Sequence, residues 1–125
     1  MTKFYICEKC KNMVEVIHET RIPMMCCGQK LTELKANTVD AAVEKHVPEV
    51  SVEGNKVVAK VGSVQHPMEE KHYIMFIFLE TDKGVKRVDL NPGEVPIAEF
   101  ALLEDEKPLA VYEYCNLHGL WKKEL

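Results

Sequence analysis

The stretch Tyr73-Ile74-Met75-Phe76-Ile77-Phe78-Leu79 decides the fold, because it is a continuous apolar run rich in aromatic and β-branched residues. A run of this length and composition is typical of a buried β-strand. The run is followed by the turn residues Asp82-Lys83-Gly84, and residues 85–90 then form a second strand-like segment before Asn91-Pro92-Gly93. We therefore predict two consecutive strands joined by a tight turn.

Further strands are expected on both sides of this pair. Residues 49–61 alternate in polarity around Glu53-Gly54-Asn55, which predicts a hairpin, and residues 98–103 and 109–114 flank a charged turn. Residues 37–46 read as a connecting loop with at most one or two helical turns, begun by Asn37 or Thr38 and closed by Val47-Pro48. Several short strands without a long amphipathic helix indicate a mainly β protein built as an antiparallel β-sandwich.

Cysteines are concentrated at the N-terminal end. Four of the five lie in the first 27 residues, as Cys7-x-x-Cys10 and the adjacent pair Cys26-Cys27. A segment as short as residues 1–36 needs a staple in order to fold, and four thiolates can close a tetrahedral metal site. A zinc knuckle and an iron site both remain open on spacing alone, although adjacent cysteines distort a regular tetrahedron. We predict one module over residues 1–36 and a second domain over residues 37–125.

The fifth cysteine, Cys115, is far from that cluster in the sequence and lies three residues before His118. Four of the five histidines are expected in loops near strand ends: His46, His66, His72 and His118. Taken singly, each could be an ordinary surface or core histidine. Together, four imidazoles and one thiolate suit iron and leave one octahedral position open for a small molecule. We assign His18 a structural or surface role.

Composition narrows the class of protein. The chain has 125 residues and a net charge of −4, which argues against nucleic acid as the main partner. No apolar run approaches the roughly 20 residues that span a bilayer, so no membrane partner is expected. The first residues lack the pattern of a signal peptide. Clustered cysteines in such a chain favour metal binding in a reducing compartment, and we expect a cytoplasmic location.

The order and spacing of these motifs resemble those of the two-iron superoxide reductases, the desulfoferrodoxin family, over essentially the whole chain. The motifs that carry the resemblance are Cys7-x-x-Cys10, Cys26-Cys27-Gly28, Glu44-Lys45-His46-Val47-Pro48, His66-Pro67-Met68, His72 and Cys115-Asn116-Leu117-His118-Gly119-Leu120-Trp121. The resemblance implies a desulforedoxin-like N-terminal module followed by an immunoglobulin-like β-sandwich. It further implies a rubredoxin-type iron on Cys7, Cys10, Cys26 and Cys27, for which zinc can substitute after heterologous expression. A second iron would be held by His46, His66, His72 and His118, with Cys115 as the axial thiolate.

The resemblance also implies an activity. The expected reaction is the one-electron reduction of superoxide to hydrogen peroxide at the ferrous His4Cys centre, without oxygen evolution, as a defence against oxidative stress. Lys45 would attract the superoxide anion and order the water that supplies protons. Glu44 would occupy the open position in the oxidised enzyme. The expected partners are an electron donor such as rubredoxin and a second copy of the chain in a homodimer.

Two other functions would account for part of the sequence. An electron carrier that uses only the cysteine-bound iron leaves the grouping of Cys115 with histidines unexplained. A zinc-stapled interaction module predicts a colourless protein that does not react with superoxide.

Overall fold

A computed structural model describes residues 2–125. The chain divides into two compact units, Met1–Lys35 and Ala36–Leu125. No helix among the described residues has the length and hydropathy needed to cross a membrane.

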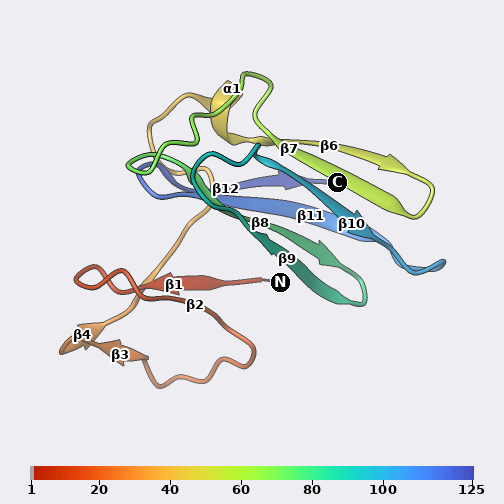
Figure 1. Cartoon of the computed structure of the whole chain (residues 1–125). Helices are drawn as coiled ribbons and strands as arrows, with labels where there is room; N and C mark the ends of the chain where they lie inside the picture. The colour runs from red at the N-terminus through yellow and green to blue at the C-terminus, as the bar shows by residue number, and fades with distance from the viewer. Residues whose placement is uncertain (1) are drawn as a thin grey trace. The chain divides into compact units, whose positions relative to one another are not determined.

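The first unit is made of short strands joined by turns and by one longer loop, residues 16–24 (Figure 1). The strand β1 lies between β2 and β5 in an antiparallel sheet, and β3 pairs with β4 in a separate hairpin. The strands are β1 (Phe4–Ile6), β2 (Met13–Glu15), β3 (Met25–Cys26), β4 (Gln29–Lys30) and β5 (Thr32–Glu33). None exceeds three residues, so strand pairing alone is a weak source of stability for this unit.

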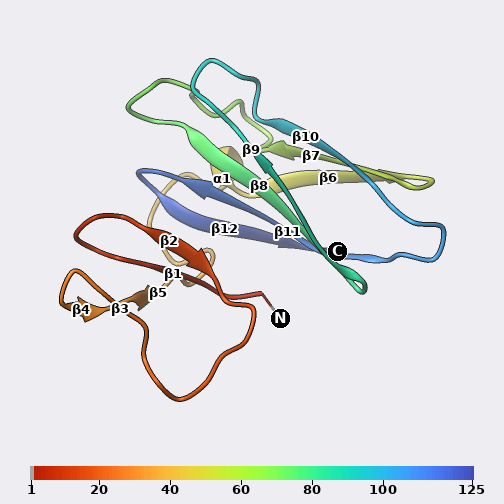
Figure 2. The same ribbon diagram turned by 60° about the horizontal axis from the view of Figure 1, so that its bottom comes forward.

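The second unit is a sandwich of two antiparallel sheets, with strand orders β10-β7-β6 and β12-β11-β8-β9 (Figures 1 and 2). Its elements are α1 (Val43–His46), β6 (Pro48–Glu53), β7 (Lys56–Val61), β8 (Ile74–Thr81), β9 (Gly84–Asp89), β10 (Ile97–Ala101), β11 (Pro108–Cys115) and β12 (Gly119–Glu124). The mainly β fold class predicted from the sequence is confirmed.

Alternating side chains from the two sheets form one apolar core. The three-stranded sheet contributes Val57, Ala59 and Val61 from β7, and the four-stranded sheet contributes residues such as Leu79 and Val111. The predicted apolar run therefore forms the central strand β8, which pairs with both β9 and β11. This core fixes the strand ends from which the loops of the functional site begin.

Three details differ from the sequence-based expectation. The strand β12 was missed, because its two buried residues Leu120 and Trp121 are adjacent and do not alternate. The short strands of the first unit were also missed. The predicted cap of the helical turn at Asn37 or Thr38 was wrong: α1 follows Ala42, and no side chain caps it.

Candidate metal centre

The four predicted histidines and Cys115 come together at one end of the sandwich. His46 is the last residue of α1, His66 lies in the loop after β7, and His72 comes just before β8. Cys115 ends β11 and His118 lies in the turn before β12. Figure 1 shows that α1, the loop between β7 and β8 and the turn between β11 and β12 lie at the same end of the two sheets. One donor atom from each of the five residues lies within 4.8 Å of the others.

Hydrogen bonds fix the tautomers of two of the histidines. Nδ1 of His46 lies 2.7 Å from the carbonyl oxygen of Ala42, and Nδ1 of His66 lies 2.7 Å from that of Pro67. A carbonyl only accepts, so both Nδ1 atoms carry the proton and donate it. Both Nε2 atoms are then bare lone pairs, yet they lie 3.1 Å apart. A shared cation removes the repulsion between them.

The four imidazoles form a closed ring. Neighbouring rings meet edge to face around the sequence His46, His66, His72, His118 and back to His46, with interplanar angles of 75°, 78°, 81° and 89°. His46 Nε2 is 3.1 Å from His66 Nε2 and 3.1 Å from His118 Nδ1. The centre of a square with 3.1 Å edges is 3.1/√2, about 2.2 Å, from each corner, close to the ~2.0–2.1 Å of a zinc–imidazole bond. This spacing would suit a first-row metal held by the nitrogens of His46, His66 and His118.

Burial keeps three of these imidazoles, those of His46, His66 and His72, neutral and ready to bind a metal. Desolvation lowers the pKa of His66 to about 4 and also lowers the pKa of His46 and of His72. His72 Nε2 is buried and has no hydrogen-bond partner among the described residues. An unpartnered buried nitrogen that points into a cluster of bare lone pairs is explained by metal ligation.

Cys115 supplies the fifth donor, and its Sγ lies 3.9 Å from His118 Nδ1. Burial raises the pKa of this thiol, while hydrogen bonds from the backbone N–H groups of Leu117 and His118 act in the opposite direction. The two N–H groups stabilise negative charge on sulfur, which is the charge of a metal-bound thiolate.

Two further residues, Trp121 and Asn116, hold the ring in place, although neither is a metal ligand. The indole of Trp121 stacks on His46 at 5.0 Å, and its Nε1–H donates to the carbonyl of His118 at 3.0 Å. Asn116 accepts from the N–H of Tyr73 at 3.0 Å and donates to the carbonyl of Lys71 at 3.0 Å. Both hydrogen bonds of Asn116 flank His72. Trp121 and Asn116 therefore each connect two of the segments that carry ligands.

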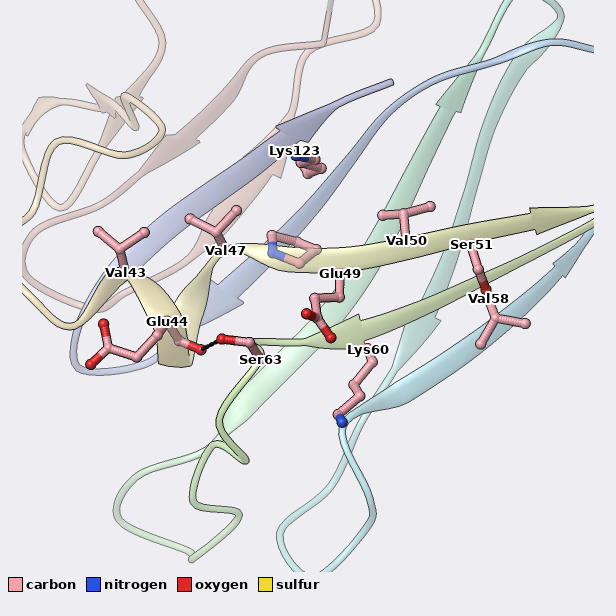
Figure 3. Close-up of a pocket in the computed structure, with 11 residues that line it drawn as sticks. Val43, Glu44, Val47, Glu49, Val50, Ser51, Val58, Lys60, Ser63 and Lys123 are labelled. Atoms are coloured by element: carbon pink, nitrogen blue, oxygen red, sulfur yellow. Dashed lines mark hydrogen bonds between the residues drawn. The ribbon is translucent and has the colours of Figure 1, made fainter.

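The two predicted catalytic residues, Glu44 and Lys45, lie on α1 beside His46, and both are exposed. The positive charge of Lys45 contributes to the lowered pKa of His46 and of His72. Glu44 is not among the described donor atoms that cluster at the site. Figure 3 shows its carboxylate pointing outward from the surface hollow beside α1.

The second candidate site unites Cys7, Cys10, Cys26 and Cys27, and all five cysteines of the chain are free. Sγ of Cys26 lies 3.6 Å from that of Cys10 and 3.9 Å from that of Cys27. Four thiolates at about 2.3 Å from one metal have sulfur–sulfur distances of about 3.8 Å. The two Sγ–Sγ distances at Cys26 are close to this value.

Electrostatics at the four cysteines also favour a metal. Backbone N–H groups of Cys10 and Lys9 lower the pKa of Cys7 to about 6. Hydrogen bonding to Cys10, then to Cys7 and Cys26, raises the pKa of Cys27 to about 12. Four thiolates this close repel one another unless a cation lies between them. His18, which was assigned no ligand role, is exposed.

Comparison with known proteins agrees with this arrangement. The family model of desulfoferrodoxin matches residues 38–124. A desulfoferrodoxin of Syntrophotalea carbinolica is 50% identical over 120 residues, which cover 96% of this chain and 94% of the relative. The chain belongs to the desulfoferrodoxin family.

Solved structures extend the likeness of this family member to both units. The crystal structure of the superoxide reductase from Treponema pallidum covers 99% of each chain, with a TM-score of 0.84 and 37% identity. A 1Fe-type superoxide reductase from Giardia intestinalis covers 66% of this chain and 99% of its own, with a TM-score of 0.56 and 39% identity.

Proposed function

We propose that the chain is a superoxide reductase, which converts superoxide to hydrogen peroxide without releasing oxygen. The observation that carries this proposal is the closed ring of four imidazoles with Cys115, in which bare nitrogen lone pairs face one another at 3.1 Å. The balanced reaction is O2•− + e− + 2 H+ → H2O2. Such a reaction removes superoxide, so the biological role is defence against oxidative stress.

Iron is the proposed metal of this ring. Five protein donors exceed the four of a structural zinc site, and four borderline nitrogens with one soft thiolate suit iron. When bound, ferrous iron supplies the electron and leaves one coordination position for the substrate. The residues named for it are His46, His66, His72, His118 and Cys115.

The protein groups around this position have separate tasks. Lys45 attracts the superoxide anion, since a local positive charge raises anion association even on an acidic protein. Its ammonium group also orders the water from which the two protons are drawn. The backbone N–H groups of Leu117 and His118 would stabilise the negative charge on the Cys115 sulfur when a metal binds it. Glu44 is the proposed carboxylate that reaches the open position in the oxidised protein.

The cysteine site of the first unit is proposed to hold a second, rubredoxin-type iron, with zinc as the metal found when iron is scarce during expression. An electron donor such as rubredoxin would reduce the protein, which would then take part in electron transport. We further propose a homodimer in the cytoplasm. Five free cysteines, four at one candidate metal site and Cys115 at the other, support a reducing compartment.

The first test is metal analysis together with the visible spectrum of the oxidised protein, for wild type and Cys115→Ser. We expect two irons per chain in the wild-type protein. In the spectrum of Cys115→Ser, one thiolate-to-iron band should be lost selectively. We also expect peroxide without oxygen when the reduced wild-type protein meets superoxide. Only zinc in the wild-type protein, or a spectrum that the substitution leaves unchanged, would favour a stapled binding module or an electron carrier.

The residue roles have tests of their own. Lys45→Ile should slow the bimolecular reaction with superoxide by about ten- to a thousandfold while both iron spectra persist. Glu44→Ala should leave that rate nearly unchanged but alter the ferric spectrum. An unaltered ferric spectrum would mean that Glu44 does not reach the metal.

A further inference from the structure

The helical turn that carries Lys45 and His46 cannot hold its own shape. The helix α1 has only four residues, and the backbone bonds at its ends include Val47 N–H to Val43 O at 2.9 Å and Lys45 N–H to Ala42 O at 3.2 Å. Its N-cap residue contributes no side-chain hydrogen bond. An isolated turn of this length is not stable in water, because nucleation costs more than one or two hydrogen bonds return.

A second segment, Gly62-Ser63-Val64, supplies the missing support. Gly62 N–H donates to the carbonyl of Val47 at 3.2 Å, and Val64 N–H donates to the carbonyl of Glu44 at 3.0 Å. The hydroxyl of Ser63 donates to the same Glu44 carbonyl at 3.3 Å, as the dashed line in Figure 3 shows. These bonds satisfy carbonyls that the end of a short helix would otherwise leave without partners.

Gly62 permits this contact because it has no side chain. The residue is buried and has φ +76°, a left-handed conformation. A Cβ at this position would lie 2.7 Å from three backbone atoms: the oxygen of Glu44 and the carbonyl carbon and oxygen of Lys45. None of the three is the end of a flexible side chain, so the turn itself would have to move.

We propose that Gly62 is a positioning residue that sets the place of Lys45 at the metal centre by direct contact with the Glu44–Lys45 backbone. The inference rests on the proposed function of Lys45 as the group that attracts superoxide. Gly62 thus acts through Lys45 and need not touch the substrate.

The chain offers a matched control. Gly54 is also left-handed, with φ +59°, but a Cβ there meets nothing within 4 Å. Gly62→Ala and Gly54→Ala therefore impose a similar backbone strain, and only the first pushes on the turn. Each should be made in the iron-loaded full chain, alone and combined with Lys45→Ile.

Two readouts are needed, and one is independent of activity. Hydrogen exchange of residues 41–48, followed by mass spectrometry, should be about tenfold faster in Gly62→Ala and unchanged in Gly54→Ala, because local opening is easier when the turn loses its support. Pulse radiolysis at low salt should show a bimolecular rate about tenfold lower in Gly62→Ala only. In the Lys45→Ile background, Gly62→Ala should change the rate by less than about twofold, because two substitutions that act through one group do not add.

The outcomes separate the possible failures. Equal exchange in the two alanine variants would overturn the inference, and so would a full tenfold loss of rate in the Lys45→Ile background. An unchanged rate in Lys45→Ile alone would overturn the function proposed for Lys45, while the exchange comparison would still decide whether Gly62 holds the turn. Should Gly62→Ala not fold, Ser63→Ala removes one of the bonds to Glu44 without a clash. It should speed the same exchange by about two- to threefold, and no change would count against the inference.

Discussion

Replacement of Trp121 by phenylalanine should lower both the stability of the sandwich and its affinity for the metal. The indole is 2% exposed, stacks on His46, and donates from Nε1 to the carbonyl of His118 at 3.0 Å. Phenylalanine keeps an aromatic ring but cannot donate. The loss of a buried donor costs about 1–3 kcal/mol, and the smaller ring adds a packing loss of about 1 kcal/mol.

The total is then about 2–4 kcal/mol, against the 5–15 kcal/mol by which a typical domain is stable. In a domain of this size about 1 kcal/mol corresponds to 4–8 °C, so the midpoint of thermal unfolding should fall by at least about 8 °C. Calorimetry of the metal-loaded protein measures this value. Because Trp121 orients two ligands from different segments, metal affinity should also fall by about ten- to a hundredfold, as measured by competition with a chelator.

Phe100→Leu provides the control for the Trp121 prediction. Phe100 is a buried aromatic residue on β10 within the apolar core, and it carries no ligand. Its substitution should lower stability by a comparable packing loss and leave metal affinity unchanged. A Trp121→Phe protein that unfolds within about 2 °C of wild type, or loses no more affinity than Phe100→Leu, would refute the argument.

Three more outcomes are expected. Removal of metal by a chelator should abolish hydrogen-exchange protection in residues 2–35 but preserve it in β8 and β11; retained protection in the first unit would contradict a metal-dependent fold. Ionised Glu106 should stabilise the wild-type protein above about pH 4.5, and this stabilisation should disappear as the pH falls toward 2. Glu106→Gln should lack it at every pH. The reason is that hydrogen bonds from Thr81 and the Leu103 N–H lower the pKa of Glu106 to about 2; parallel pH profiles of the two unfolding midpoints would contradict it. Asn116→Ala should cost about 1–3 kcal/mol in urea unfolding, and a change below about 0.5 kcal/mol would show that its bonds beside His72 contribute little.

The sequence was enough to predict the strands that have a clear period or a long apolar run. Strand β8 came from its apolar run, and the hairpin of β6 and β7 came from alternation around Gly54. Strand β12 has neither signal: Leu120 and Trp121 are neighbours, and both are buried. A strand that buries adjacent residues cannot be recognised by alternation.

For the candidate site, residue types and motif order pointed to the donors, but not to how they are held. Local spacing cannot show that Trp121 spans from His46 to the carbonyl of His118, since these contacts join segments up to 75 residues apart. Gly62 gave no signal either, because a glycine before a polar loop looks like any turn residue. A glycine is needed here because the backbone of Glu44 and Lys45 lies against it, and only the fold brings these segments together.

The donor ring has two halves that are supported in different ways. His72, Cys115 and His118 lie at the ends of β8, β11 and β12, where the sheet and Asn116 fix them. His46 instead ends the short helix α1, and His66 lies in the loop after β7. Gly62, at the start of that loop, contacts the backbone of α1. Loop segments open more readily than paired strands. The contact of Gly62 with the Glu44–Lys45 backbone is therefore expected to restrain the half of the ring that would otherwise open first.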